Sequence, residues 1–97
     1  METTFTFRNI EATDAIKDHT SQKLEKIKKF LIKPLNVHII LSIEKFRHQA
    51  EITLNADGIQ HVSRQQSEDL YTSIDQAVDK LMKQVKKHKE RVKAHKV

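Results

Sequence analysis

SEDLYTSIDQAVDKLMKQVKKHKERVKAHKV, residues 67–97, has the periodicity of one long amphipathic helix. At 100° per residue, a sector about 80° wide holds six of its large apolar side chains, Tyr71, Ile74, Val78, Leu81, Val85 and Val92. A second sector of about the same width, on the opposite side, holds Lys80, Lys83, Lys87 and Arg91. We expect the apolar side to pack on a sheet and the other to present cations roughly 5–6 Å apart. Phosphates of a nucleic-acid backbone have a similar spacing, so a polyanion is the expected partner.

The residues before this helix have the pattern of a β-hairpin. Ala50, Ile52, Leu54 and Ala56 alternate with polar residues, and Asp57-Gly58 is a two-residue signal for a type I′ turn. This turn pairs residue 56 with 59, 54 with 61, 52 with 63 and 50 with 65. Directly opposed residues share a face, which predicts a weaker strand with an inward face of Ile59, His61, Ser63 and Gln65. A helix is expected to pack close to Ser63, and Ser67 is expected to cap the final helix.

The N-terminal half contributes two more strands and a second helix. Residues 3–8 and 36–44 both alternate between apolar and polar side chains, which is typical of strands with one buried face. Between them, Thr13 is a good N-cap, and Pro34 is expected to end the helix that follows. The buried stripe of this helix is predicted to be Ile16, Thr20, Leu24, Ile27 and Leu31. A row of cations lies on the flank of that stripe: Lys23, Lys26, Lys29 and Lys33.

The order of elements is therefore β-α-β-β-β-α, and the predicted fold class is α+β. We expect a single-domain, two-layer sandwich with a four-stranded mixed sheet, both helices on one face and the other face solvated. The strand–helix–strand passage predicts a parallel pair, and the remaining pairs are antiparallel. Residues 1–97 are expected to form this one domain, with a basic, partly disordered tail at about residues 90–97.

Composition excludes several classes of function. The 97 residues contain no cysteine, which excludes disulfides, thiolate zinc sites and thiol catalysis. Residues 80–97 hold eight Lys/Arg and one acid, a charge of +7, whereas residues 1–79 hold ten against twelve, a charge of −2. No apolar run approaches the roughly 18 residues of a membrane span, so a cytoplasmic protein is expected. The six histidines match no metal motif, and no nucleophile–base pair is visible. We therefore expect no catalytic residue, metal site, cofactor or small-molecule substrate, and no enzyme activity.

Three segments carry a resemblance to a known family. Residues 69–91, DLYTSIDQAVDKLMKQVKKHKER, resemble the last helix of bacterial ribosome hibernation-promoting factors, the family that includes protein Y. Residues 43–54, IEKFRHQAEITL, and residues 12–17, ATDAIK, are similar to two further segments of that family. The resemblance covers nearly the whole chain and agrees with the predicted order of elements.

The resemblance implies a stress and stationary-phase factor that binds ribosomal RNA of the small ribosomal subunit. Members occupy the channel of messenger RNA and of the A- and P-site transfer RNAs, which inhibits translation and stabilises inactive ribosomes. The chain lacks the second domain of long members and the acidic extension of protein Y. It therefore resembles the short type, which acts with a separate ribosome-pairing modulation factor. The candidate RNA-binding residues are Lys23, Lys26, Lys29, Lys80, Lys83, Lys86, Lys87 and Arg91.

The residues themselves leave two alternatives open. The chain could be a generic double-stranded RNA-binding domain, or a protein-interaction regulator that uses the solvated sheet face. No aromatic residue interleaves the lysines, which argues against base stacking on this surface. Contacts to phosphate and sugar are expected instead, so that recognition depends on the shape of folded RNA. His88 lies in the basic stretch and is a candidate for a further RNA contact.

Overall fold

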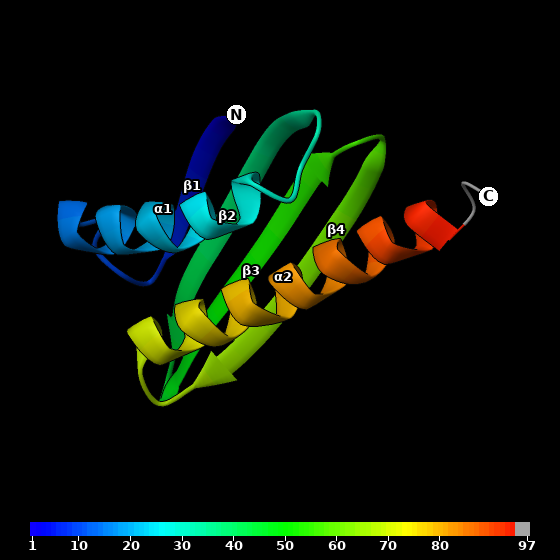
Figure 1. The fold of residues 1–97 in the computed structure, drawn as a ribbon. Helices are drawn as coiled ribbons and strands as arrows, with labels where there is room; N and C mark the ends of the chain where they lie inside the picture. Colours follow the sequence, from blue (N-terminus) through cyan, green and yellow to red (C-terminus); the bar gives the residue numbers. More distant parts are fainter. Residues whose placement is uncertain (95–97) are drawn as a thin grey trace.

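The computed structural model describes the fold of residues 1–94 and the side-chain surroundings of residues 1–90. Figure 1 shows the six elements, which are β1 (Glu2–Arg8), α1 (Asp14–Lys28), β2 (Pro34–Glu44), β3 (Arg47–Ala56), β4 (Ile59–Ser67) and α2 (Leu70–Ala94). The predicted basic tail begins inside α2, and its last part, residues 95–97, lies outside the described residues. Its partial disorder therefore stays a prediction.

The strands form one sheet in the order β1-β2-β3-β4. β1 pairs with β2 in parallel, and the β2–β3 and β3–β4 pairs are antiparallel. Both helices cross the same face of the sheet, as Figure 1 shows. This arrangement is the predicted α+β two-layer sandwich, with the parallel pair where a helix connects two strands. The predicted fold class is confirmed.

The core lies between the sheet and the helices because the strands alternate. Along β2 the buried residues are Val37, Ile39 and Leu41, each fully buried. β3 adds Ala50, Ile52, Leu54 and Ala56, and the helices cover them with Leu24, Ile27, Ile74, Val78 and Leu81. On the opposite face, His38 of β2 bonds to the hydroxyls of Thr4 and Thr6 of β1. The face without helices is thus polar, as expected for a half-solvated sheet.

The β3–β4 hairpin has the predicted turn and register. Asp57 and Gly58 have φ angles of 54° and 74°, and both values are positive, as a type I′ turn requires. Residues 56, 54, 52 and 50 pair with 59, 61, 63 and 65. At the third of these pairs, the Ser63 hydroxyl donates to the Ala77 carbonyl of α2 at 2.8 Å. The small polar residue of β4 therefore lies where α2 approaches the sheet, as predicted.

The first helix ends earlier than predicted. α1 stops at Lys28, so Leu31 and Lys33 lie in the loop to β2 and not on the helix. The N–H groups of Phe30 and Leu31 donate to the carbonyls of Ile27 and Lys28, three residues back, which tightens the chain into a turn. Pro34 disfavours helical geometry just before it, and the helix ends well ahead of that position.

The N-cap of α2 also differs from the prediction. Ser67 is the last residue of β4, and Asp69 caps the helix by accepting the Thr72 N–H at 3.0 Å. The hydroxyl and the N–H of Thr72 both donate to this carboxylate, and they lower the pKa of Asp69. Ser67 instead bonds to Asp69 and to the Ser73 hydroxyl, which braces the turn from β4 into α2. In α1 the predicted cap is confirmed, since Thr13 accepts the Ile16 N–H.

Neither α1 nor the described length of α2 contains a run of apolar residues long enough to cross a membrane.

Candidate nucleic-acid interface

The two helices lie side by side on the sheet. The His19 Nε2 of α1 is 2.7 Å from the Asp75 Oδ1 of α2, and its ring meets the Tyr71 ring edge-on at 4.8 Å between centroids. Just past the other end of α1, Phe30 lies against the later turns of α2. The helices therefore run in the same direction, which brings their basic C-terminal halves to one end of the molecule (Figure 1).

Most of the predicted lysines are exposed and make no ion pair with the described carboxylates. These are Lys26 of α1, Lys29 directly after the end of α1, and Lys80, Lys83, Lys86 and Lys87 of α2. Lys23 differs, because it is half-buried and its Nζ lies 3.8 Å from the Asp75 Oδ1. Asp75 offsets part of its charge, so Lys23 is less available to an external anion. The side chain of Arg91 lies outside the described residues.

The lysines of α2 divide between its two flanks. Lys80 and Lys83 line a shallow hollow with Gln65 of β4, so they lie on the side of α2 that is turned away from α1. Lys87 follows Lys83 by one helical turn. Lys86 lies on the other flank, with its Nζ 5.0 Å from the centre of the Phe30 ring. Lys86 therefore connects the basic surface of α2 with the end of α1.

Three lysine ammonium groups lie around the Phe30 ring, an arrangement that the sequence did not indicate. Besides Lys86, the Nζ atoms of Lys29 and Lys89 lie 5.7 and 5.9 Å from the ring centre. We call Phe30, Lys29, Lys86 and Lys89 the Phe30–lysine cluster. The expectation that no aromatic residue interleaves the lysines is wrong, because Phe30 lies in the turn after α1 and contacts two lysines of α2. The sequence feature that could have indicated this cluster is Phe30, an aromatic residue directly beside Lys29 and outside the strands.

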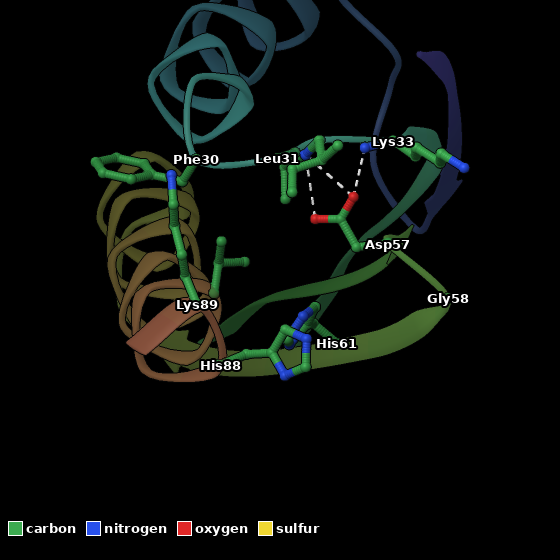
Figure 2. Close-up of a pocket in the computed structure, with 10 residues that line it drawn as sticks. Phe30, Leu31, Lys33, Asp57, Gly58, His61, His88 and Lys89 are labelled. Atoms are coloured by element: carbon green, nitrogen blue, oxygen red, sulfur yellow. Dashed lines mark hydrogen bonds between the residues drawn. The ribbon is translucent and has the colours of Figure 1, made fainter. Parts of the chain in front are cut away.

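A pocket of about 580 Å³ lies next to the Phe30–lysine cluster, between the α1–β2 loop, the β3–β4 turn and α2 (Figure 2). Leu31 and Val85 give it apolar walls, and Lys33 and Lys89 are among its lining residues. His61 of β4 and His88 of α2 face each other across its floor, with ring centroids 6.0 Å apart. We call this the histidine pocket.

Asp57 holds the loop that forms one wall of the histidine pocket. Its carboxylate accepts the backbone N–H groups of Ile32 and Lys33, and its own N–H donates to the Lys33 carbonyl at 3.0 Å. Figure 2 shows the carboxylate turned toward the loop. The same residue therefore shapes the β3–β4 turn and fixes the α1–β2 loop against it.

His61 is buried beneath the pocket, and its exposed fraction is 8%. Burial lowers the pKa of His61 below its ordinary value, and the neighbouring His88 lowers it further. Asp57 and the Gln84 side chain act in the opposite direction. The neutral imidazole is therefore the form that the fold favours.

Within residues 1–90, no three His, Asp or Glu side chains are grouped so that they could hold a metal ion.

Comparison with known proteins places this fold in a family. Residues 3–93 match the family described as Sigma 54 modulation protein / S30EA ribosomal protein, and the chain belongs to that family. It is 30% identical over 95 residues to the ribosome hibernation promoting factor of Escherichia coli K12, covering 98% of this chain and all of that protein. It is 34% identical over 91 residues to the protein of the same name from Pseudomonas putida, covering 94% and 89% of the two chains.

Solved structures agree with this assignment. The N-terminal domain of Thermus thermophilus Protein Y superposes with a TM-score of 0.86 at 34% identity, over 91% of this chain and 99% of that one. A ribosomal subunit interface protein from Coxiella burnetii has a TM-score of 0.82 at 23% identity, over 93% and 99% of the two chains, and supports the fold. The resemblance inferred from the three sequence segments is confirmed.

Proposed function

We propose that this protein is a ribosome hibernation factor without enzyme activity. It acts in the cytoplasm, binds the small ribosomal subunit in the channel of messenger RNA and of the A- and P-site transfer RNAs, and blocks translation there. Members of its family named for ribosome hibernation match it over nearly their whole length, which supports the ribosome as the target. A separate ribosome-pairing factor is the further partner that we propose.

One observation carries the RNA-binding part of this proposal. Six lysines, five on two adjacent helices and one directly after the end of α1, are exposed and have no described carboxylate as an ion-pair partner. Unpaired cations on neighbouring elements favour the binding of a polyanion. Each contact between a lysine and a phosphate releases counterions from the nucleic acid, which stabilises the complex. Lys26, Lys29, Lys80, Lys83, Lys86 and Lys87 are the proposed contacts, and Lys23 contributes less because Asp75 is its neighbour.

The test is co-sedimentation of purified protein with small ribosomal subunits on sucrose gradients. The variant Lys83→Glu/Lys87→Glu is expected to lose at least about 100-fold in affinity, since it removes two phosphate contacts and adds two repulsive charges. Lys45→Glu/Arg47→Glu, at the β2–β3 turn, is the matched control. Both double variants lower the formal net charge by four, from +5 to +1. Equal loss in both would mean that net charge and not this surface drives binding.

The same assay separates the proposal from a generic double-stranded RNA-binding domain. A ribosome-specific factor binds small subunits far more tightly than a long RNA duplex at the same salt concentration. Comparable affinities for both would favour the generic domain. Binding that survives both high salt and the Lys83→Glu/Lys87→Glu change would favour a protein partner on the solvated sheet face.

A further inference from the structure

We propose that the histidine pocket and the Phe30–lysine cluster together bind one unpaired nucleotide. The base enters the pocket, and the phosphate lies at Lys29, Lys86 and Lys89. This inference rests on the proposed function in one respect, because we expect the nucleotide to belong to the RNA that the lysines hold.

The Phe30–lysine cluster has the charge of an anion site. Three ammonium groups lie 5.0–5.9 Å from one ring centre, and no described carboxylate pairs with any of them. Like charges gathered around one ring repel each other, and the ring attracts them without neutralising them. A phosphate placed among them would remove the repulsion, and it offers an acceptor oxygen to each ammonium group.

The histidine pocket has the size and lining of a site for a planar ring. Its volume of about 580 Å³ falls in the usual range for small-ligand sites, roughly 300–1,000 Å³. Leu31 and Val85 are apolar, while His61 and His88 add flat imidazole faces and nitrogen atoms for hydrogen bonds. Nucleobases combine a flat apolar face with polar edges, and they stack on side chains that include histidine.

Lys89 connects the two parts. It lines the pocket, and its Nζ lies 5.9 Å from the Phe30 ring. Figure 2 shows this side chain extending from α2 along the pocket to the ring. The pocket also has Lys33 in its lining, and its one lining carboxylate, Asp57, bonds to the backbone of Ile32 and Lys33. The whole site is therefore positively charged, which suits an anionic ligand.

A base in this pocket must be unpaired. In a duplex, both faces of a base are covered by its neighbours, and its edge is bonded to its partner. Loops, bulges and ends leave bases free to stack on protein side chains. The site therefore predicts that the protein prefers RNA with an unpaired nucleotide over a perfect duplex.

The experiment compares two fluorescent RNA hairpins with the same number of phosphates, one with a single-nucleotide bulge and one fully paired. By anisotropy at fixed salt, the wild-type protein is expected to bind the bulged hairpin about 10-fold more tightly, as one stacked base allows. Leu31→Trp fills the pocket, and His88→Ala removes one imidazole. Both should reduce the ratio to about one. Val62→Ala, on the solvated face of β4, is the matched control and should retain it. Circular dichroism checks that each variant is folded.

A second measurement distinguishes RNA from a free nucleotide as the source. Adenosine, guanosine and uridine monophosphates are titrated into ¹⁵N-labelled wild-type protein, and amide shifts are followed at His61 and His88. A bulge preference that depends on the pocket supports RNA as the source. Shifts without a bulge preference support a free nucleotide in the same pocket. No preference and no shifts would overturn the nucleotide site. Failure of the proposed function looks different, because Lys83→Glu/Lys87→Glu would then bind ribosomal subunits like the wild type.

Discussion

At the scale of single residues, His61 links protonation to folding. Its pKa is lowered in the folded protein, chiefly by burial and then by His88, whereas an unfolded chain leaves it near 6.5. Between these two values the unfolded chain binds more protons than the folded one. Acid therefore favours unfolding in this range, and the contribution of neutral His61 is present above pH 6.5. Asp57 acts in the opposite direction and raises the pKa of His61. Lys33 and Lys89 are the other charged residues that line the pocket.

We predict that the free energy of unfolding falls as the pH is lowered from 7.5 through 6.5 toward 5, and that His61→Gln reduces this fall. His88→Gln should reduce it too, because the pKa of His61 then moves back toward its ordinary value. Urea denaturation at each pH measures the effect, and the difference between wild type and variant isolates His61 from the other histidines. Equal pH dependence in wild type and His61→Gln would contradict this account.

Single residues also show where sequence reasoning stops. Both positive φ angles of Asp57-Gly58 follow from the identity of the two residues, so the turn was predictable. The contact of Phe30 with Lys86 and Lys89 was not, because it needs the end of one helix beside the other. By helical arithmetic, Lys89 falls on the apolar side of α2. Its long side chain instead reaches the Phe30 ring while remaining exposed.

At the scale of elements, the close approach of α2 to β4 depends on Ser63. Its side chain is buried, and its hydroxyl donates to the Ala77 carbonyl within α2. Ala77 is itself fully buried, so both partners at this contact are small. A larger residue at position 63 would push the helix away from the sheet.

We predict that Ser63→Ala lowers the free energy of unfolding by about 1 kcal/mol, the usual value of one hydrogen bond. Ser63→Val should cost more, about 1–3 kcal/mol, because it adds volume to a packed contact. Val62→Ser, on the solvated face of the same strand, should change stability by less than about 0.5 kcal/mol. Urea denaturation of the three variants provides the comparison. A Ser63→Val variant as stable as the wild type would mean that α2 does not pack tightly here.

Element types were more predictable than element ends. Alternation and helical periodicity placed all four strands and both helices, since each pattern reflects one buried face. The end of α1 at Lys28 depends on the hydrogen bonds of the turn that follows it. The spacing of apolar residues along the sequence does not reveal these bonds. The cap of α2 required a choice between Ser67 and Asp69, which are both good N-caps. Pairing of residues 59–67 with β3 takes Ser67 into the sheet and leaves Asp69 as the cap.

At the scale of the whole molecule, the lysines make binding to ribosomes depend on salt. We predict that raising the salt concentration from about 50 to 200 mM weakens ribosome binding on the order of 10³-fold, if about six phosphates are neutralised. Measuring the affinity for small subunits at four or more salt concentrations gives the slope. Lys83→Ala should reduce the magnitude of the slope by about one, and Lys45→Ala at the β2–β3 turn should leave it unchanged. A flat salt dependence would exclude a phosphate-dominated interface.

The whole molecule also shows which part of the candidate surface the sequence could supply. Helical spacing identified lysines that prove exposed, because a lysine opposite an apolar stripe must face solvent. Lys23 illustrates the limit, since Asp75 belongs to the other helix and its proximity depends on how the helices pack. The histidine pocket needs the α1–β2 loop, the β3–β4 turn and α2 together. No single stretch of sequence carries that information.

The edge position of β1 has a consequence for synthesis of the chain. Among the described strands, β1 pairs with β2 alone, although α1 separates the two in the sequence. A polypeptide is synthesised from its N-terminus, so β1 leaves the ribosome before β2 has been made. Until then, β1 has no strand to which it can hydrogen-bond. In residues 34–94, in contrast, each strand pairs with the next strand along the chain. These strands can therefore pair as they are synthesised. We therefore expect the earliest-made strand to join the nascent sheet late.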